Sequence, residues 1–388
     1  MADEAAAAPS ARLLREEFLL DPQVTFLNHG SFGACPEPVM RTFEAWSREL
    51  EREPVEFLLR RATGLVRTQA DALAAYLRCS ADDLVLLPNA TYALNMVARS
   101  LPLTDRDRVL TTDHEYGAID RLWEFVCERT GATLVRCPLP VPVHGAADVV
   151  SAFDDMLDET VRVVSLSHIT SPTGLVLPVE EVCRLARAVG AITVVDGAHG
   201  PGQLDLDIPS VGADFYIGNC HKWLCSPKVA GFLHSRPGVE VRVDPLVVSW
   251  GWDADELAER AHWQGTPALS ALLSISAAID YQRDRDWAAV NARCAADAAY
   301  VHERLLALPG VTPVSDAAQP LFRQMVSVLL PPAAADAHIQ QRLFADHAIE
   351  LPINAWHGGL LMRVSVAAYN DREDLDRLVG ALGPMLSP

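Results

Sequence analysis

The sequence has little basic charge and no long apolar run. Lysine and arginine together number 32 against 51 aspartates and glutamates, a net charge of −19 over 388 residues. Such a surface repels phosphate backbones and anionic lipid head groups, so we expect no nucleic acid and no membrane partner. No stretch approaches the roughly 18 uninterrupted apolar residues of a membrane span. Residues 1–10 lack the basic start and apolar core of a secretory signal, so we expect a cytoplasmic protein.

Common metal-binding and nucleotide-binding motifs are also missing. The eight cysteines show no CxxC spacing, so reduced, buried thiols are expected and no metal site is predicted. The patterns HExxH, GxGxxG and GxxxxGK followed by Ser or Thr do not occur. A metal-dependent hydrolase and a cofactor-binding scaffold without activity are nevertheless alternatives to weigh. The hydrolase would draw on Asp113, His114, Glu115, His199 and His221.

The composition and its patterning indicate an α/β protein of two domains. With 50% hydrophobic and 21% charged residues, the chain has the make-up of a folded globular protein. From residue 83 to about 235, short apolar runs alternate with longer amphipathic segments, which is the pattern of a mostly parallel sheet covered by helices. Long Ala- and Leu-rich helices and a compact α+β segment follow. We expect a large domain over residues 21–285 and a smaller one from residues 1–20 and 286–388.

The periodicity predicts specific strands and helices. The predicted strands are Leu84–Leu87, Val109–Thr111, Thr133–Cys137, Val161–Ser167, Ile192–Asp196, Asp214–Ile217, Val229–His234, Met325–Leu330 and Leu361–Val366. The predicted helices are Ala90–Arg99, Gly117–Arg129, Ala147–Leu157, Val179–Val189, Ala268–Asp284, Trp287–Leu306 and a closing helix from Arg372.

Two strand ends carry residues suited to chemistry. Asp196 ends a nearly all-apolar strand, and ligands of open α/β sheets bind at the carboxyl ends of strands. Lys222 follows the next strand, where partial burial would favour its nucleophilic amine form. Taken singly, a loop-ordering aspartate and an exposed lysine are equally ordinary explanations. An aspartate and a lysine at the ends of two such strands together indicate a pyridoxal phosphate site. The lysine binds the aldehyde of this cofactor, and the carboxylate keeps its ring nitrogen protonated.

The phosphate of such a cofactor needs a third element. The turn Pro88–Thr91 opens a helix, and the free N–H groups and positive dipole end of a helix bind phosphate well. A simple capping role for Asn89 or Thr91 is the alternative for this turn alone.

These motifs resemble the class V aminotransferase family of fold-type I pyridoxal phosphate enzymes. The resemblance is carried by VVDGAHGPGQ (194–203), YIGNCHKW (216–223), NATYALN (89–95), GTP (265–267) and MRVSVAAYN (362–370). FLNHGSFGACP (26–36) and DHEYGA (113–118) resemble its isopenicillin N epimerase-like branch. The resemblance covers nearly the whole chain. It implies a mostly parallel sheet sandwiched by helices, a smaller α+β C-terminal domain, and a homodimer with shared active sites.

The resemblance also implies roles for single residues toward the cofactor, pyridoxal 5'-phosphate. Lys222 would bind its aldehyde and later shuttle the Cα proton, and Asp196 would bind the ring nitrogen. His199 would contact the ring hydroxyl, in the place where cysteine desulfurases carry a glutamine. Either His114 or Tyr116 would stack on the ring. The phosphate contacts would come from Ala90, Thr91, Asn219 and His221, with Thr266 reaching in from the neighbouring subunit.

The substrate implied by the resemblance is an α-amino acid. Arg363 would clamp its α-carboxylate bidentately, with Asn28 and His29 also contacting the substrate. By analogy with the branch, the substrate is a natural-product amino acid of secondary metabolism. Its side chain would lie against Phe32, Tyr116, Trp356 and His357.

Departures from the family pattern reduce the number of candidate reactions. The stretch Ile353–Leu361 contains no cysteine where cysteine desulfurases carry a reactive one, so we expect no persulfide transfer. Pro267 and Ala268 replace charged residues of isopenicillin N epimerases, and Ser171 stands where desulfurases place an asparagine near the ring.

We predict a lyase that acts through a Cα carbanion. It would release sulfur from a cysteine S-conjugate by β-elimination, with His114 or Tyr116 as the acid for the leaving sulfur. Cα epimerisation is the alternative. Transamination, and decarboxylation coupled to oxidative deamination, begin from the same intermediate.

Overall fold

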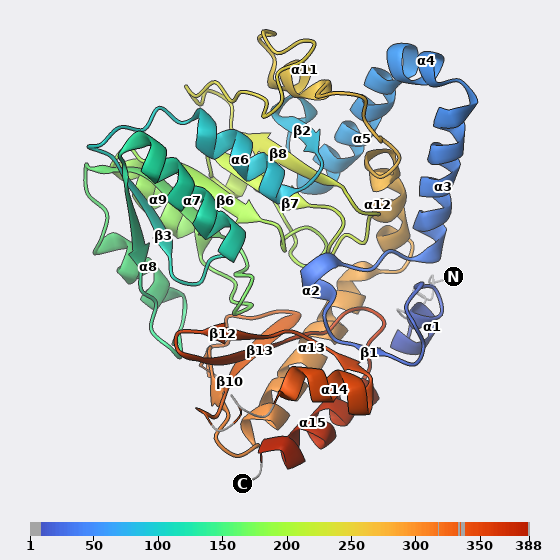
Figure 1. Ribbon diagram of the computed structural model, residues 1–388, viewed down its shortest axis with the longest axis vertical. Helices are drawn as coiled ribbons and strands as arrows, with labels where there is room; N and C mark the ends of the chain where they lie inside the picture. The colour runs from blue at the N-terminus through green and yellow to red at the C-terminus, as the bar shows by residue number, and fades with distance from the viewer. Residues whose placement is uncertain (1–8, 317, 333, 335–337, 387–388) are drawn as a thin grey trace, which may run out of the picture.

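Two β-sheets organise the chain, the larger in the upper half of Figure 1 and the smaller below it. The structure is a computed structural model that describes residues 9–316, 318–332, 334 and 338–386. The larger sheet has the strand order β2-β8-β7-β6-β5-β3-β4; β8 runs antiparallel to β2 and β7, and the other pairs are parallel. Its strands, in that order, are Leu84–Leu87, Gly231–Ser235, Phe215–Asn219, Ile192–Gly197, Val161–Ser167, Arg108–Thr112 and Thr133–Cys137.

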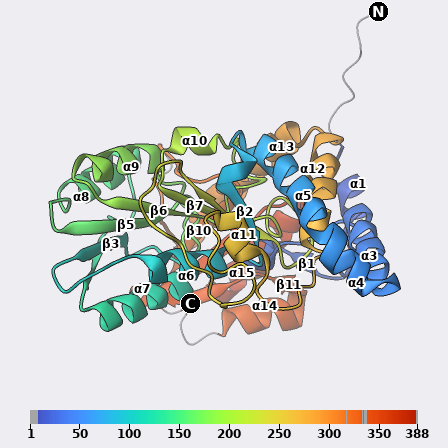
Figure 2. The same ribbon diagram turned by 90° about the horizontal axis from the view of Figure 1, so that it is seen from above.

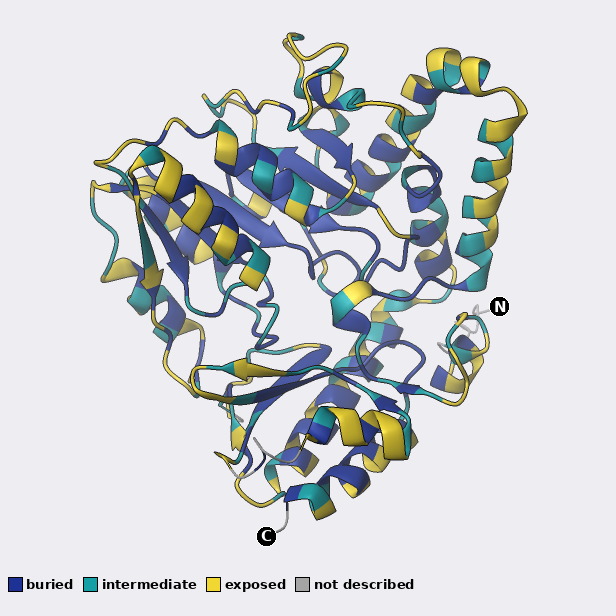
Figure 3. Cartoon of the chain, in the orientation of Figure 1, coloured by how far each residue is buried: buried dark blue, intermediate teal, exposed yellow. Residues whose placement is uncertain are grey.

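Helices cover both faces of this sheet, as the view from above shows (Figure 2). Helices α6 and α7 pack on one face, and α5, α8, α9 and α10 on the other. Strands β5, β6 and β7 are therefore buried almost throughout (Figure 3), as parallel strands with two covered faces are. This architecture confirms the predicted sandwich. The helices are α5 (Ala62–Leu77), α6 (Ala90–Ser100), α7 (Gly117–Thr130), α8 (Ala146–Asp154), α9 (Val179–Ala188) and α10 (Ile208–Val211).

The smaller sheet is antiparallel, with the strand order β12-β13-β10-β9. Helices α13, α14 and α15 close one face around a core that includes Val328 and Val364. Met325 and Leu361 belong instead to the core of the larger half, so the two halves pack directly on each other. The elements are β9 (Thr312–Pro313), β10 (Met325–Leu330), β12 (Ile353–Trp356), β13 (Gly359–Ser365), α13 (Trp287–Leu306), α14 (Ile339–His347) and α15 (Arg372–Leu386).

The N-terminal segment packs first on the smaller half. β1 (Thr25–Phe26) pairs in parallel with β11 (Ile349–Glu350), and Leu27 joins the smaller half's core. Helix α2 (His29–Phe32) then lies at the junction of the two halves (Figure 1). The domain limits after residues 20 and 285 stay a prediction, and the β1 pairing favours a crossing nearer to Leu27. The remaining elements are α1 (Ala11–Arg15), α3 (Glu37–Arg52), α4 (Pro54–Glu56), the π-turn Phe57–Arg61, α11 (Leu257–His262), α12 (Ile275–Arg283) and short 3₁₀ turns at Ala81–Asp83 and Leu272–Ser274.

The structure departs from the predicted elements in several places. The helix predicted over Ala268–Asp284 begins only with the 3₁₀ turn at Leu272 and continues as α12. The Ser274 hydroxyl donates to the Ser270 carbonyl at 2.8 Å, a local bond that competes with regular helix. The helices between residues 37 and 77 were not predicted, nor was β12, a short and partly exposed edge strand. Within the described ranges, no helix is long and apolar enough to cross a membrane.

Candidate active site

Asp196 lies where three parallel strands end side by side. In the sheet register it stands between Ser167 of β5 and Ile217 of β7. The side chain is buried, and its Oδ1 accepts the Ala198 N–H at 2.9 Å. Its other carboxylate oxygen forms no hydrogen bond with any described residue. Burial raises the pKa of Asp196, and the Ala198 N–H and Lys222 oppose that shift.

Lys222 follows β7 and reaches the same strand ends. Its Nζ lies 3.1 Å from Nε2 of His199, three residues after Asp196. Burial lowers the pKa of Lys222 to about 8, Asp196 acts in the opposite direction, and Arg363 lowers it further. The nucleophilic amine is therefore a much larger fraction of Lys222 near neutral pH than it is of an ordinary lysine. Lysine occurs at only one other position in the sequence, the exposed Lys228.

His29 is hydrogen-bonded to the backbone of this lysine. Its Nε2 lies 3.0 Å from the Lys222 carbonyl oxygen, and its Nδ1 lies 3.0 Å from the Tyr369 hydroxyl. A carbonyl only accepts, so Nε2 donates its proton there and Nδ1 accepts from Tyr369. Both ring nitrogens are thus engaged within the protein. These contacts favour a positioning role for His29 over its predicted contact with substrate.

Gly33 permits the close approach of this segment to the lysine. Its φ is 69°, and a Cβ at this position would lie 2.0 Å from the His221 carbonyl oxygen and 2.9 Å from the Lys222 Cα. Both neighbours are backbone atoms that cannot move aside cheaply. A glycine is therefore required where α2 ends against the lysine loop.

The residues predicted to bind phosphate gather at the start of α6. Asn89 caps the helix by accepting the Tyr92 N–H at 2.9 Å, and Asn219 at the end of β7 accepts the Ala90 N–H at 2.8 Å. The exposed Thr91 has an amide with no partner in the described chain. His221 bonds the Ala230 carbonyl through Nδ1 at 2.9 Å. The Ala90 amide is therefore engaged, while the Thr91 amide is open to an anion.

Thr266 lies in an exposed loop beside the same helix. Its neighbour Gln264 is hydrogen-bonded to the Tyr92 hydroxyl in the first turn of α6. This contact is made within one chain. The predicted contribution of Thr266 to a neighbouring subunit stays a prediction.

His114 lies beneath a hairpin of the smaller sheet. Its ring is fully buried, with Nδ1 3.0 Å from the Thr173 hydroxyl and Nε2 without a hydrogen bond. The Trp356 ring meets it edge-on at 4.9 Å, and the His357 ring stacks on Trp356 at 4.1 Å. Asp113 lies 3.8 Å from His114 Nε2 and 3.7 Å from His357 Nε2. Burial lowers the pKa of His114 to about 4, although Asp113 raises it, so the ring is neutral.

The other predicted aromatic residues lie nearer to solvent. Tyr116 precedes the first residue of α7 and is 46% exposed, and Phe32 at the end of α2 is 69% exposed. Of the two residues predicted to stack on the ring, the buried His114 has the setting that suits a stacking contact. The assignment stays a prediction.

Arg363 is a buried cation without a carboxylate partner among the described residues. It is 6% exposed, its Nη1 donates to the Ser171 carbonyl, and its Nη2 donates to the Ser31 hydroxyl at 3.0 Å and to Asn28 Oδ1 at 3.5 Å. Its Nε has no partner in the described part of the chain. Burial lowers the pKa of Arg363 to about 10, at which it is still charged at neutral pH. Such a guanidinium is suited to a ligand carboxylate.

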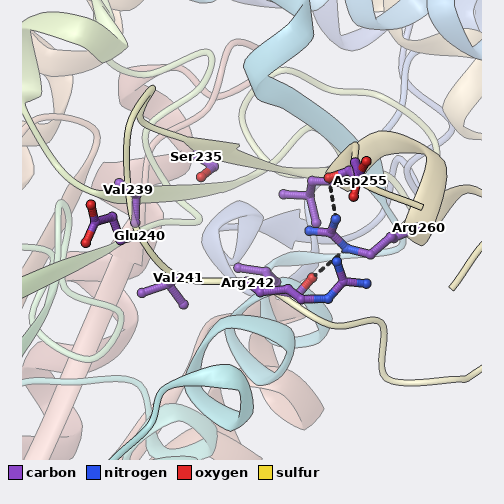
Figure 4. A pocket seen from close by; sticks show the side chains of 9 residues that line it. Ser235, Val239, Glu240, Val241, Arg242, Asp255 and Arg260 are labelled. Carbon is purple, nitrogen blue, oxygen red and sulfur yellow. Dashed lines mark hydrogen bonds between the residues drawn. The ribbon is translucent and has the colours of Figure 1, made fainter. Parts of the chain in front are cut away.

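A separate cavity of about 370 Å³ lies between β8 and α11 (Figure 4). Arg260 in its wall donates to the backbone carbonyls of Val243, Ala254 and Asp255 at 3.2, 2.8 and 2.5 Å. The guanidinium thereby holds an irregular segment together. None of the predicted site residues lines this cavity, so it is distinct from the candidate active site.

The fold and the site agree with the comparison to known proteins. The family model for aminotransferase class-V matches residues 35–378. The chain belongs to this family. Isopenicillin N epimerase from Streptomyces clavuligerus is 34% identical over 383 residues, covering 95% of this chain and 96% of that protein. An L-cysteine desulfhydrase from Arabidopsis thaliana is 30% identical over 277 residues, covering 66% of this chain and 60% of that protein.

Solved structures of similar fold confirm the predicted fold-type I architecture. The cystine C–S lyase C-DES in complex with cysteine persulfide has a TM-score of 0.83 at 22% identity, covering 95% of this chain and 99% of that one. The cysteine desulfurase CsdA from Escherichia coli has a TM-score of 0.80 at 21% identity, covering 97% and 98%.

Several residues of this class-V site had no predicted role. Tyr369 and Trp223 stand inside the quoted motifs, which was a signal that they lie near the site. Ser31 also stands inside a quoted motif, FLNHGSFGACP. Thr173 gave no comparable signal, because its partner His114 is far away in the sequence.

Arg363→Lys is expected to weaken binding of an α-amino acid by about 1 to 3 kcal/mol, because the ammonium keeps the charge but loses the fork that grips a carboxylate. Titration calorimetry with wild type and variant measures the change. Arg293→Lys is the matched control, since Arg293 donates to the Asn370 and Ala368 carbonyls in the smaller half. Unchanged binding in Arg363→Lys would place the carboxylate elsewhere.

Proposed function

We propose that this pyridoxal 5'-phosphate enzyme cleaves the carbon–sulfur bond of a cysteine S-conjugate by β-elimination. The observation that carries the proposal is the meeting of a lysine of lowered pKa, a buried aspartate and a buried arginine that has no carboxylate partner among the described residues. The hairpin that lies over His114 has no cysteine. Bound pyridoxal phosphate supplies an aldehyde that condenses with amines and a ring that withdraws electrons from Cα.

The residues present fit this cofactor. Lys222 offers an amine in its nucleophilic form, and Asp196 keeps one carboxylate oxygen free for a protonated ring nitrogen. The open Thr91 amide at the start of α6, an 11-residue helix, suits the phosphate. Asp196 and Lys222 lie at the ends of the neighbouring strands β6 and β7, and Thr91 follows β2 of the same sheet.

Each of the chain's own groups then has a separate task. Arg363 holds the α-carboxylate, and Asp196 holds the proton on the ring nitrogen. Lys222 takes the Cα proton once its nitrogen is free, because its lowered pKa lies closer to the working pH than that of an ordinary lysine. The buried His114 and the half-buried Trp356 that packs on it shield one side of the site from water.

The leaving sulfur needs a proton donor. His114 and Tyr116 are the candidates from the sequence, and the structure adds His357, which stacks on Trp356 and lies beside Asp113. The hairpin of β12 and β13 brings this histidine in place of a cysteine. The sulfur therefore departs as a thiol and is not carried by the enzyme.

Relatives support both this reaction and a second candidate. The similarity to an L-cysteine desulfhydrase supports removal of sulfur from a cysteine-type substrate. Epimerisation at Cα is the second candidate, because the match to isopenicillin N epimerase runs the length of both chains. The two reactions share proton removal from Cα and differ in whether a Cβ group leaves.

Lys222→Ala is expected to abolish the visible absorption of the bound cofactor and all turnover, because the only other lysine, Lys228, is exposed and does not reach the strand ends. Absorption spectra, borohydride reduction and peptide mass analysis measure this. Lys228→Arg, which removes the other lysine, should leave both properties intact. Thermal melting of both variants checks the fold, and an unchanged Lys222→Ala spectrum would contradict the assignment.

A cysteine S-conjugate is expected to give one thiol, one pyruvate or related 2-oxo acid and one ammonia, with no persulfide on the enzyme. The Cβ–S bond breaks, the sulfur gains a proton, and water hydrolyses the remaining imine. The reaction is run in heavy water and followed by mass analysis. An epimerase would return intact, inverted substrate with deuterium at Cα, and that result without thiol release would overturn the lyase proposal. Transamination would keep the sulfur in the 2-oxo acid, and a decarboxylating oxidase would consume oxygen and release carbon dioxide; either would also overturn it.

We also propose a homodimer in which Thr266 completes the neighbour's phosphate site. Mixing inactive Thr266→Ala and Lys222→Ala chains should then restore up to one working site per mixed dimer, because each chain supplies what the other lacks. Activity of the mixture against each variant alone is the measurement. Lack of complementation would show that each chain builds its own site.

A further inference from the structure

Trp223 stands directly after the lysine, and its indole lies against the far side of His199. The Trp223 Nε1 is 3.2 Å from His199 Nδ1, and His199 Nε2 is 3.1 Å from the Lys222 Nζ. Trp223 is 3% exposed and His199 is 2% exposed, so water does not compete for the bond between these two rings. The three side chains form one line of hydrogen bonds that ends at the amine.

The indole N–H of Trp223 determines which nitrogen of His199 carries the proton in this line of hydrogen bonds. An indole N–H only donates, so His199 Nδ1 accepts and carries no proton. Burial lowers the pKa of His199 well below its usual range, and its neighbours Lys222, Arg363, His29 and His221 act in the same direction. The imidazole is therefore neutral, with its single proton on Nε2. That proton points at Lys222, whose nitrogen must accept it with a lone pair.

We propose that Trp223 is a positioning residue that fixes His199 as the Nε2–H tautomer and so keeps Lys222 as a free amine. This inference rests on the proposed role of Lys222 as the amine that binds the cofactor. Without the indole proton, His199 is free to move its proton to Nδ1 and to accept one from a lysine ammonium. Asp196 is the anion that favours that ammonium, and Arg363 opposes it.

Contacts to its backbone carbonyl and to its ring hold Trp223 in place. The Trp223 carbonyl accepts the Gln282 side-chain N–H at 2.8 Å, and the His29 ring lies 4.7 Å from the Trp223 ring. Gly202 has a φ of 87°, and a Cβ there would lie 2.1 Å from the Trp223 carbonyl oxygen. His29 thus contacts both the indole and the Lys222 backbone, which couples the position of the indole to that of the lysine.

The tautomer can be read in the wild-type protein without any substitution. Full-length, cofactor-free protein labelled with ¹⁵N-histidine is expected to show His199 neutral with its proton on Nε2, by long-range ¹H–¹⁵N correlation. A proton on Nδ1, or an imidazolium, would overturn the proposal. In Trp223→Phe we expect the Nδ1–H form or the imidazolium to appear.

The second measurement is the reactivity of Lys222 toward acetic anhydride as a function of pH, with Lys228 in the same chain as the internal reference. Trp223→Phe is expected to lower Lys222 reactivity at neutral pH by roughly tenfold, the change that one pKa unit produces. Trp123→Phe is the matched control, because Trp123 is also buried and donates its indole proton, to the Ser165 hydroxyl at 2.9 Å. A melting temperature close to that of Trp123→Phe shows that the Trp223 variant folds.

An unchanged His199 tautomer and unchanged Lys222 reactivity in Trp223→Phe would reduce Trp223 to a packing residue. Both measurements use cofactor-free protein, so they succeed or fail independently of the cofactor assignment. That assignment is tested separately by the Lys222→Ala spectrum.

Discussion

The site depends on charged groups that are buried without a full set of charged partners. Transferring a charge out of water is costly unless it is paired, so each group settles in a different way. Lys222 loses part of its charge, Arg363 is surrounded by hydroxyl and carbonyl oxygens, and Asp196 rests on one backbone N–H. These positive and negative groups still lack charged partners, so the site attracts a ligand that carries both charges, a zwitterion.

The two halves of the chain meet in this site because the loop after β5 touches both. Thr173 in the loop bonds His114, and the Ser171 carbonyl accepts from Arg363 of β13. Gly174, with a φ of 69°, lies so close to β10 that a Cβ would be 2.8 Å from the Met325 carbonyl oxygen. Groups contributed by the two sheets are therefore held at a fixed separation by backbone contact.

The sequence identified the buried strands and the residues at their ends because a covered parallel strand is apolar throughout. β2, β4, β5, β10 and α13 have the predicted bounds, and α13 is marked by Asp286, whose side chain caps it. Contacts between residues far apart in the sequence could not be predicted from the sequence. The contacts of His29 with Tyr369 and of the Trp356 hairpin with His114 depend on how the halves dock, which local patterns do not encode. The contact of Trp223 with His199 depends on how the loops after β6 and β7 pack on each other.

Only two of the 32 basic residues are lysines, both in the loop that follows β7. Arginine provides the surface cations elsewhere, and a guanidinium does not form a stable imine with an aldehyde as a primary amine does. A reactive aldehyde in the cell therefore meets few competing side-chain amines on this chain. Because the chain has almost no other lysines, an aldehyde reacts selectively with Lys222. This selectivity comes from the composition of the chain as well as from the geometry of the site.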